Sequence, residues 1–548
     1  MGDNLGTRKA RGAFFTPPKI ARYLAEWALQ SSADTVLEPS CGEASFLLAA
    51  ARRLESLTEG TKDWAGQLNG VEIHLESAEQ ASVLLAAEGY GATIAVGDFF
   101  EYASDQKFTA VVGNPPFVRY QNFSGASRAR SLEAALAQGV RLSALASSWA
   151  AFVVKAALHV APEGRLALVL PAELLTVGYA AEIRRFLLSR FSRVRLIMFE
   201  ERVFPEVLAD CILLLAEGTG KATSFEVYQT RDAESLDAVE LAEWTSYAPA
   251  TGDKWTPALL AHNAFSTYRD VLGTHFEQLR EWGGAYLGAV TGNNSFFSLT
   301  AYEAAERGLV SSDLIRILPP GSRRMRGLTL SDSVWQQLRR ENHKCYLLWP
   351  AKEPSNEAWR YISDGEQDGV PSAYKCRVRS PWWRVPLVGV PDLFLTYMNH
   401  DRPRLVTNAA GAHILNSVYG IRLAEDRRAL GRDLLPVASL NSVTLLGAEV
   451  VGRAYGGGLL KMEPREADQL PLPSLARVQH FEKELRLAKP QLSQALRRGD
   501  LTSAVAKIDS ILLADVPEAD LTALRVAREM LFERRRARGK SGESRRPS

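Results

Sequence analysis

The sequence lacks paired cysteines, long apolar runs and a large excess of either charge. Its four cysteines, Cys41, Cys211, Cys345 and Cys376, lie far apart and form no CxxC pair, which argues against a disulfide scaffold and against a zinc-binding spacing. No segment approaches the roughly 18 consecutive apolar residues that span a bilayer. The first residues contain no apolar core of signal-peptide length. These absences predict a cytoplasmic protein with no membrane partner and no metal site.

The charge and the length set two further bounds. The net charge is only +2, from 65 basic and 63 acidic residues, so any attraction to nucleic acid depends on local basic patches. A chain of 548 residues predicts about two to four domains. With 46% hydrophobic and 23% charged residues, the composition is typical of a folded globular chain.

Short apolar runs alternate with helical patterns over about the first 220 residues. This alternation predicts an α/β fold with a doubly wound, mostly parallel sheet in a domain spanning residues 1–245. Ligands then bind at the carboxyl ends of the strands. We expect strands at 35–37, 68–73, 92–96, 108–112 and 165–170, helices at 20–30, 46–57, 75–89 and 148–160, and a turn at 162–164.

The alternation stops after about residue 245. Polar, aromatic and basic stretches over residues 250–475 predict a second, mixed α+β domain, with a short helix at 439–446. Residues 476–538 are helical and charged in pattern, with a second helix from about Ala504. The basic, low-complexity end, residues 539–548, is predicted to be disordered.

The segment Asn114-Pro115-Pro116-Phe117 directly follows an apolar run. Two consecutive prolines fix φ and remove two backbone donors, so the segment is a stiff loop. Such a loop can present the Asn114 side-chain oxygen and the Pro115 carbonyl as two acceptors for a planar amino group, with the Phe117 ring against its face. An isolated NPPF fits a proline-rich turn with a buried phenylalanine equally well.

Acidic residues stand at the ends of three other predicted strands: Glu38, Glu72 and Asp98. The turn after Glu38 is neither GxGxxG nor a P-loop, so it predicts no phosphate cradle. Glu72 has the position from which an acid binds ribose hydroxyls in such folds, and Asp98 can accept from an adenine amine. Each acid alone is more often a solvated loop residue or a helix cap; four consecutive strand ends with suitable residues favour a ligand site.

The order FFTPP, LEPSCG, VEI, GDFF and NPPF over roughly residues 10–215 resembles the gamma-class DNA adenine-N6 methyltransferases, which include the TaqI-type modification enzymes. Two departures are Phe117, where many members have tyrosine, and His74, where a second acid often follows. The resemblance implies a Rossmann-like fold, S-adenosylmethionine as cofactor, double-stranded DNA as substrate and a C-terminal target-recognition domain. It also implies a role in a restriction-modification system, with a separately encoded restriction endonuclease as a possible partner.

The resemblance also implies roles for individual residues. In the cofactor site, Thr16 and Pro17 line the methionine moiety, Glu38, Pro39 and Ser40 lie beside the methionine and sulfonium, Glu72 with Ile73 binds the ribose, and Asp98 with Phe99 binds the adenine. In the catalytic site, Asn114 and Pro115 hold the target N6 amine and Phe117 stacks on the target base, with Phe204 near the extruded base.

The adenine amine is a poor nucleophile because its lone pair is delocalised into the ring. Two acceptors can localise that lone pair, so direct methyl transfer needs positioning and no covalent enzyme intermediate. Cys41 is accordingly interpreted as a packing residue. Because the target atom is hidden in a duplex, the base must be flipped out. Stacking on Phe117 offsets roughly 1–3 kcal/mol of the lost stacking.

The second half contains the candidate DNA-binding residues. Arginines clamp phosphates or read guanine edges, and the sequence does not distinguish the two roles. A solvated basic face is an equally good interpretation of any one cluster. The predicted DNA-binding residues are Arg323, Arg324, Arg326, Lys375, Arg377, Arg379, Arg402 and Arg404.

Three other functions remain open. Protein-glutamine and RNA methyltransferases share NPPY-like loops, but a C-terminal half with arginine–aromatic clusters favours DNA. A fused nuclease would usually precede the cofactor motifs, and Thr16 leaves no room for one. A non-catalytic DNA-binding module is disfavoured by the intact Asn114 and Glu38. We expect the protein to act as a monomer.

Overall fold

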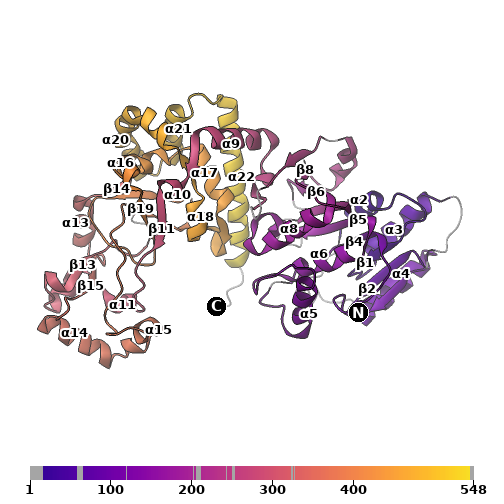
Figure 1. The fold of residues 1–548 in the computed structure, drawn as a ribbon, viewed down its shortest axis with the longest axis horizontal. Coiled ribbons are helices and arrows are strands. Elements are labelled where there is room, and N and C mark those ends of the chain that lie inside the picture. The colour runs from indigo at the N-terminus through magenta and orange to yellow at the C-terminus, as the bar shows by residue number, and fades with distance from the viewer. Residues whose placement is uncertain are drawn as a thin grey trace. The chain divides into compact units, whose positions relative to one another are not determined.

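The computed structural model describes residues 16–58, 64, 66–118, 120–201, 203–204, 211–241, 243–249, 254–321, 325 and 327–543, of which 240, 241, 456 and 537–543 are described by their backbone only. The chain divides into two compact units, residues 1–261 and 262–548 (Figure 1). Residues 254–261 belong to the first unit, since Trp255 stacks on Phe225 at 3.9 Å and its backbone N–H donates to the carbonyl of Leu175. This division lies slightly beyond the boundary at 245–250 expected from the sequence.

The first unit is built around one large, mostly parallel sheet. Strands β3, β2, β1, β4 and β5 are parallel neighbours, and β7 is antiparallel between β5 and β6. The α/β class and the mostly parallel sheet predicted from the sequence are confirmed. In sheet order the strands are β3 (Thr93–Val96), β2 (Leu68–Glu72), β1 (Val36–Glu38), β4 (Phe108–Gly113), β5 (Val160–Pro171), β7 (Cys211–Thr219), β6 (Phe191–Phe199), β8 (Phe225–Thr230) and β9 (Thr245–Tyr247).

The helices of this unit follow the predicted alternation, and the four that were predicted begin and end within two residues of their expected limits. Their apolar spacing made them predictable, because a helix buries residues three and four apart on one face. The helices are α2 (Pro18–Ala28), α3 (Ser45–Ser56), α4 (Leu75–Ala87), α5 (Gly125–Leu136), α6 (Ser148–Leu158), α7 (Glu173–Thr176) and α8 (Ala181–Arg190).

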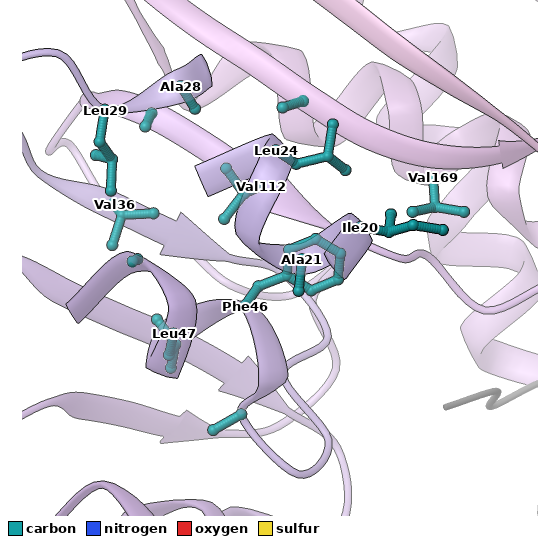
Figure 2. Close-up of a cluster of buried hydrophobic side chains, with 14 of the residues drawn as sticks. Ile20, Ala21, Leu24, Ala28, Leu29, Val36, Phe46, Leu47, Val112 and Val169 are labelled. Atoms are coloured by element: carbon teal, nitrogen blue, oxygen red, sulfur yellow. The ribbon is translucent and has the colours of Figure 1, made fainter. Parts of the chain in front are cut away.

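A buried apolar cluster supports the strand ends. Ile20 and Leu24 of α2 pack with Phe46 of α3, and Val36 of β1 and Val112 of β4 belong to the same cluster (Figure 2). All five side chains are almost completely buried. A close-packed interior of this kind fixes the backbone above it, so the carboxyl ends of β1 and β4 have fixed positions.

The turn predicted at residues 162–164 is wrong. Strand β5 begins at Val160 and continues through these residues, and its register against β4 shifts between Phe108 and Ala110. An added Cβ at Gly164 would lie 2.9 Å from the carbonyl oxygen of Thr109 and from Cγ1 of Val160. The glycine therefore allows the irregular ladder to pass close to β4, which sequence reasoning interpreted as a turn.

The second unit is mixed α+β, as expected. Its described strands form a five-stranded sheet in the order β11-β19-β16-β18-β14 and three smaller sheets, β12-β15-β13, β17-β21-β20 and β10-β22. The strands are β10 (Phe276–Gln278), β11 (Gly283–Leu287), β12 (Ser298–Leu299), β13 (Leu314–Arg316), β14 (Thr329–Leu330), β15 (Tyr346–Leu348), β16 (Leu393–Leu395), β17 (Met398–Asn399), β18 (Leu405–Asn408), β19 (Tyr419–Leu423), β20 (Arg453–Tyr455), β21 (Leu459–Lys461) and β22 (Pro471–Pro473).

Helices are more frequent in this unit than the sequence suggested. The expected short helix at 439–446 is α17, which begins at Ser442, because the Asn441 side chain accepts from the Thr444 N–H and caps it. The helices are α9 (His262–His275), α10 (Leu279–Trp282), α11 (Asn294–Phe297), α12 (Ala301–Glu306), α13 (Asp332–Arg340), α14 (Asn356–Gln367), α15 (Tyr374–Arg377), α16 (Arg428–Ala438), α17 (Ser442–Val451), α18 (Pro464–Asp468), α19 (Leu475–His480), α20 (Glu482–Arg498), α21 (Leu501–Leu512) and α22 (Glu518–Glu543).

Helix α22 continues into the segment predicted to be disordered. Its backbone is helical to Glu543, so the prediction for 539–548 is wrong for 539–543, and 544–548 lie outside the described residues. Within α22, the buried Arg535 makes a two-pronged ion pair with the buried Glu449 of α17, at 2.9 and 2.8 Å. Packing against α17 therefore stabilises a helix whose basic composition alone favours a solvated chain.

Among the described residues, no single helix has the length and apolar composition needed to cross a membrane. Two consecutive helical segments, residues 425–438 and 442–451, together have that length and composition, but the chain bends by 89° between them.

Candidate active site

The sheet order brings four sequence-predicted positions to one edge. Strands β3, β2, β1 and β4 are adjacent and parallel, so Asp98, Glu72, Glu38 and Asn114 stand in that order at or just beyond their carboxyl ends. Three inter-strand spacings amount to about 14 Å. This edge can therefore hold an elongated ligand across four strands.

The turn after β1 is held against β2. The Cys41 N–H donates to the Val71 carbonyl at 3.0 Å, and the Gly42 N–H donates to Oε2 of Glu72 at 2.9 Å. Gly42 and Ala44 have φ of +47° and +60°, so the chain makes a sharp, left-handed entry into α3. The buried Cys41 side chain lies against Gly70, where an added Cβ would approach its Sγ to 3.1 Å, and this contact agrees with a packing role.

Glu38 is the most deeply buried acid of this edge. Only 2% of the residue is exposed, and its Oε2 accepts from the Leu47 N–H at 3.0 Å. Burial raises the pKa of the Glu38 carboxyl well above its ordinary value, the hydrogen bond from Leu47 opposes this rise, and the nearby charge of Glu72 adds to it. An ionised Glu38 therefore requires a nearby positive charge.

Glu72 connects two turns. Besides Gly42, its carboxylate accepts from the His74 N–H at 3.0 Å, while the residue remains 7% exposed. The neighbouring Ile73 side chain is 55% exposed. The end of β2 thus presents a fixed carboxylate next to an accessible apolar surface.

Asp98 is also fixed in orientation. Its Oδ1 accepts from the Phe100 N–H at 3.0 Å, and its Oδ2 lies 3.0 Å from Nη2 of Arg130 on α5. The Phe99 ring is buried and stacks on Phe152 at 5.3 Å, so a ligand can meet its backbone but not its ring face. Arg130 was not predicted, because it lies 32 residues away and no local pattern links it to Asp98.

The NPPF loop presents one polar atom with no partner. Nδ2 of Asn114 donates to Oγ1 of the buried Thr16 at 3.2 Å, which orients the amide. Oδ1 of Asn114 is buried and has no hydrogen-bond partner among the described residues. The Ser40 hydroxyl donates to the Asn114 carbonyl at 3.4 Å. Buried acceptors are nearly always satisfied in folded proteins, so this oxygen is a strong candidate for a ligand contact.

Ser148, at the start of α6, holds the other end of the loop. Its hydroxyl donates to the Pro116 carbonyl and accepts from the Val118 N–H at 2.9 Å, and its N–H donates to the Val118 carbonyl at 3.0 Å. Sequence reasoning missed this residue. The available signal was the pair Ser147-Ser148 before an apolar helix, which is typical of a helix start.

The two candidate stacking residues belong to the same buried cluster. Phe204 is 5% exposed and part of the cluster, and Phe117 is half-buried and packs against it. Pro39, another predicted residue, borders the loop: an added Cβ at Gly113 would lie 3.5 Å from Cδ of Pro39. Pro17 accepts from the N–H groups of Ile20 and Ala21 through its carbonyl and so begins α2.

Two of the predicted DNA-binding residues are exposed together. Lys375 and Arg377 lie on α15, and their charged groups lie 5.5 and 5.9 Å from the centroid of the Tyr374 ring. Tyr374 itself is 64% exposed. Arg323, Arg324 and Arg326 lie outside the described residues.

Three other predicted DNA-binding arginines make internal contacts. Arg379 donates to the carbonyls of Val290 and Thr291, and Arg404 pairs with Asp401 at 3.0 Å. Arg402 is 7% exposed, and burial lowers the pKa of its guanidinium to about 10. Arg379 and Arg404 have partners inside the second unit, and Arg402 is buried with its Nε lacking a partner among the described residues, so none of the three is a freely exposed cation of the kind expected from the sequence.

Comparison with known proteins identifies both halves of the chain. Residues 4–238 match the family model described as N-6 DNA Methylase. Residues 252–513 match the model of the C-terminal domain of type II methyltransferase M.Eco57I.

Two curated relatives match along most of their length. The type II methyltransferase M.XamI of Xanthomonas campestris pv. amaranthicola is 26% identical over 86% of this chain and 87% of its own. The type II methyltransferase M.AccI of Acinetobacter calcoaceticus is 21% identical over 93% of this chain and 94% of its own. The solved type IIG restriction endonuclease BpuSI aligns with 96% of this chain at 14% identity and a TM-score of 0.44, and this chain spans 65% of that one.

The parallel sheet with its inserted antiparallel strand and the polar strand ends define an S-adenosylmethionine-dependent methyltransferase. More specifically, the chain is a DNA adenine-N6 methyltransferase whose first half matches the N-6 DNA Methylase model and whose second half matches the C-terminal domain of a type II methyltransferase. It transfers a methyl group from S-adenosylmethionine to N6 of adenine in DNA. A protein or RNA substrate is not favoured, because the second half matches the C-terminal domain of a type II methyltransferase.

Proposed function

We propose that Asn114 and Pro115 hold the target adenine by its exocyclic amine. The observation that carries this proposal is Oδ1 of Asn114, which is buried and without a partner while Nδ2 of the same amide is held by Thr16. One amine hydrogen is donated to this oxygen and the other to the Pro115 carbonyl. The Ser148 contacts to Pro116 and Val118 keep both acceptors in place.

The two acceptors act on the geometry of the amine. Hydrogen bonds to both N–H groups draw the nitrogen from planar toward tetrahedral, which localises its lone pair. S-adenosylmethionine supplies the electrophilic methyl group on its sulfonium. Because the nucleophile is held in line, the step requires orientation and no strong base. As the bond from N6 to the methyl carbon forms, the bond from sulfur to that carbon would break and leave a neutral thioether, and the extra proton on N6 would pass to water.

We assign the cofactor site to the strand-end edge. The acids at this edge supply acceptors for a ligand with a positive sulfonium, ribose hydroxyls and an adenine amine, and no phosphate is involved. Glu38, Pro39 and Ser40 face the methionine portion with Thr16 and Pro17; Glu72 and Ile73 face the ribose, and Asp98 with the Phe99 backbone faces the adenine. A sulfonium is also the kind of positive charge that an ionised Glu38 requires.

We infer that the target adenine is flipped out of the duplex before transfer. An N6 atom within a base stack cannot reach a loop such as Asn114-Pro115. Phe117 stacks on the flipped base, and Phe204 supports the position of Phe117 from within the apolar cluster.

We further propose that residues 250–475 read the DNA sequence and that the chain is a gamma-class enzyme acting as a monomer in the cytoplasm. Its methylation protects host DNA from a separately encoded endonuclease. Among the predicted DNA-binding residues that the structure describes, Lys375 and Arg377 are the two that are exposed, and we propose that they contact phosphates.

The decisive test is Asn114→Ala. Mapping methylated adenines in DNA from cells that express the protein first supplies the recognition sequence. On a duplex containing it, we expect single-turnover methylation to fall at least 100-fold, in line with the loss of a transition-state hydrogen-bond partner. Affinity for DNA should remain within about twofold of wild type.

The exposed loop residue Asn122 provides a matched control, and Asn122→Ala should leave the rate unchanged. An Asn114→Ala enzyme that retains more than a few per cent of the activity contradicts the two-acceptor mechanism.

A further inference from the structure

A single arginine bridges two acids beside the proposed adenine site. Arg130 of α5 places Nη2 at 3.0 Å from Oδ2 of Asp98 and Nη1 at 3.0 Å from Oε1 of Glu101. The Asp98 side chain is only 8% exposed, while Arg130 and Glu101 are 36% and 58% exposed. Asp98 is thus held from inside by the Phe100 N–H and from outside by a guanidinium.

Helix α5 is itself fixed to the segment that follows the catalytic loop. Nη1 of Arg128 donates to the carbonyls of Tyr120 and Phe123, at 2.9 and 2.7 Å, and Nη2 donates to the carbonyl of Ala144. Arg128 thus connects α5 to the chain on both sides of the helix, before it at Tyr120 and Phe123 and after it at Ala144. Arg130, two residues further on, connects α5, which follows the NPPF loop in the chain, to Asp98 just beyond β3.

One nitrogen of the Arg130 guanidinium makes no contact with the two acids. Its Nε is buried and has no hydrogen-bond partner among the described residues. Its other nitrogens make charge-assisted contacts, which are stronger and more directional than neutral ones. A side chain held at two points in this way fixes the plane of the carboxylate it contacts.

We propose that Arg130 is the positioning residue of the adenine subsite: through its ion pair it fixes Asp98 so that the carboxylate accepts from the 6-amino group of the cofactor. This inference rests on the proposed assignment of Asp98 to the adenine. Hypoxanthine differs from adenine in having a carbonyl oxygen in place of that amine. An oxygen facing a fixed carboxylate is repelled, so Arg130 contributes to selection of an adenosyl over an inosyl ligand.

The test compares the affinities of two neutral product analogues, S-adenosylhomocysteine and S-inosylhomocysteine, measured by calorimetry on the full chain. In Arg130→Ala we expect the affinity for S-adenosylhomocysteine to fall about 10-fold, while that for S-inosylhomocysteine changes less than about twofold. Arg130→Lys reaches only one acid at a time and should recover part of the discrimination. The kcat at saturating S-adenosylmethionine should stay within about twofold, with the loss confined to KM.

The exposed Arg141, which lies between α5 and α6, provides the matched control, and Arg141→Ala should leave both affinities unchanged. Thermal melting shows whether each variant is folded; if Arg130→Ala is not, Arg130→Gln and Arg130→Lys carry the comparison. Equal weakening of both analogues, or a fall in kcat with unchanged affinities, shows that Arg130 supports only the catalytic loop and overturns the proposal.

The variant Asp98→Ala distinguishes the role of Arg130 from the assignment of Asp98 to the adenine amine, on which that role rests. If Asp98→Ala retains the adenine preference, Asp98 does not contact the amine and the site assignment itself fails. If Asp98→Ala abolishes the preference and Arg130→Ala does not, only the role of Arg130 is wrong. If both abolish it, the double variant should lose no more than Asp98→Ala alone, since the two residues act through one contact.

Discussion

The two units differ in whether the polar groups of their predicted functional residues have partners within the protein. In the first unit, the buried Oδ1 of Asn114 has no hydrogen-bond partner among the described residues, and the carboxyl of Glu38 is buried in surroundings that raise its pKa. In the second unit, Arg379 donates to two internal carbonyls and Arg404 pairs with Asp401. The comparison teaches that a buried polar group marks a ligand site only when it lacks a partner, whereas a basic sequence cluster marks a surface only when its cations are exposed.

The largest expected effect concerns the internal ion pair of the second unit. Arg535→Ala leaves Glu449 buried without a partner, which should lower the free energy of unfolding by about 3–5 kcal/mol. Chemical denaturation monitored by tryptophan fluorescence measures this loss. Arg535→Met with Glu449→Leu removes both charges and should restore most of it. A double variant as unstable as the single one would show that the ion pair is not the source of stability.

Phe117→Ala tests the stacking side of the first unit. Loss of about 1–3 kcal/mol of base stacking predicts a methylation rate about 5- to 150-fold lower. The fluorescence of 2-aminopurine at the target position should show less flipped base at equal enzyme occupancy. Phe117→Tyr preserves the ring and should stay near wild type. If the alanine variant keeps the rate but melts earlier, the ring acts only in packing against the apolar cluster.

Lys375→Ala with Arg377→Ala tests which cations are presented to DNA. Two fewer phosphate contacts should reduce the slope of log affinity against log salt by about 2 and weaken binding about 10-fold at low salt. Cofactor affinity should not change, because α15 lies in the other unit.

Arg402→Ala is the contrasting variant, and it should reduce thermal stability with little change in the salt slope. The comparison between exposed and buried cations fails if Arg402→Ala changes the slope and the α15 variant does not.

The smallest effect concerns Glu38. Burial raises the pKa of this carboxyl in the folded protein. The protonated carboxyl therefore favours the folded state at pH values below the pKa of the unfolded chain. This contribution to stability is lost as the pH rises through the higher pKa of the folded protein. Glu38→Gln cannot ionise. Without cofactor, it should melt about 2 °C higher than wild type at pH 9, with a smaller difference at pH 5.

The same variant should bind the positively charged S-adenosylmethionine less well relative to neutral S-adenosylhomocysteine. If the difference in melting temperature between Glu38→Gln and wild type is the same from pH 5 to pH 9, ionisation of Glu38 does not destabilise the folded protein.

Much of the first unit could be predicted because its signals are local. The helical spacing of apolar residues in 18–28 and the apolar run at 108–113 involve only neighbours within a few residues. The segment Asn-Pro-Pro-Phe is recognisable as a stiff loop because its two prolines restrict the backbone. The irregular β5 could not be predicted, because only the approach of Gly164 to β4 explains it. The contact of α22 with α17 through Arg535 and Glu449 likewise joins residues that are far apart in the sequence.

By itself the sequence determined the class of fold, the order of the polar strand ends and the stiff loop, since periodicity and proline chemistry act over short stretches of chain. Only the tertiary structure decided that Thr16 orients Asn114 from 98 residues away, that Arg130 fixes Asp98, and that Arg402 is buried. These contacts join residues with no local relation, and whether a charge is free or paired depends on what the folded chain places beside it.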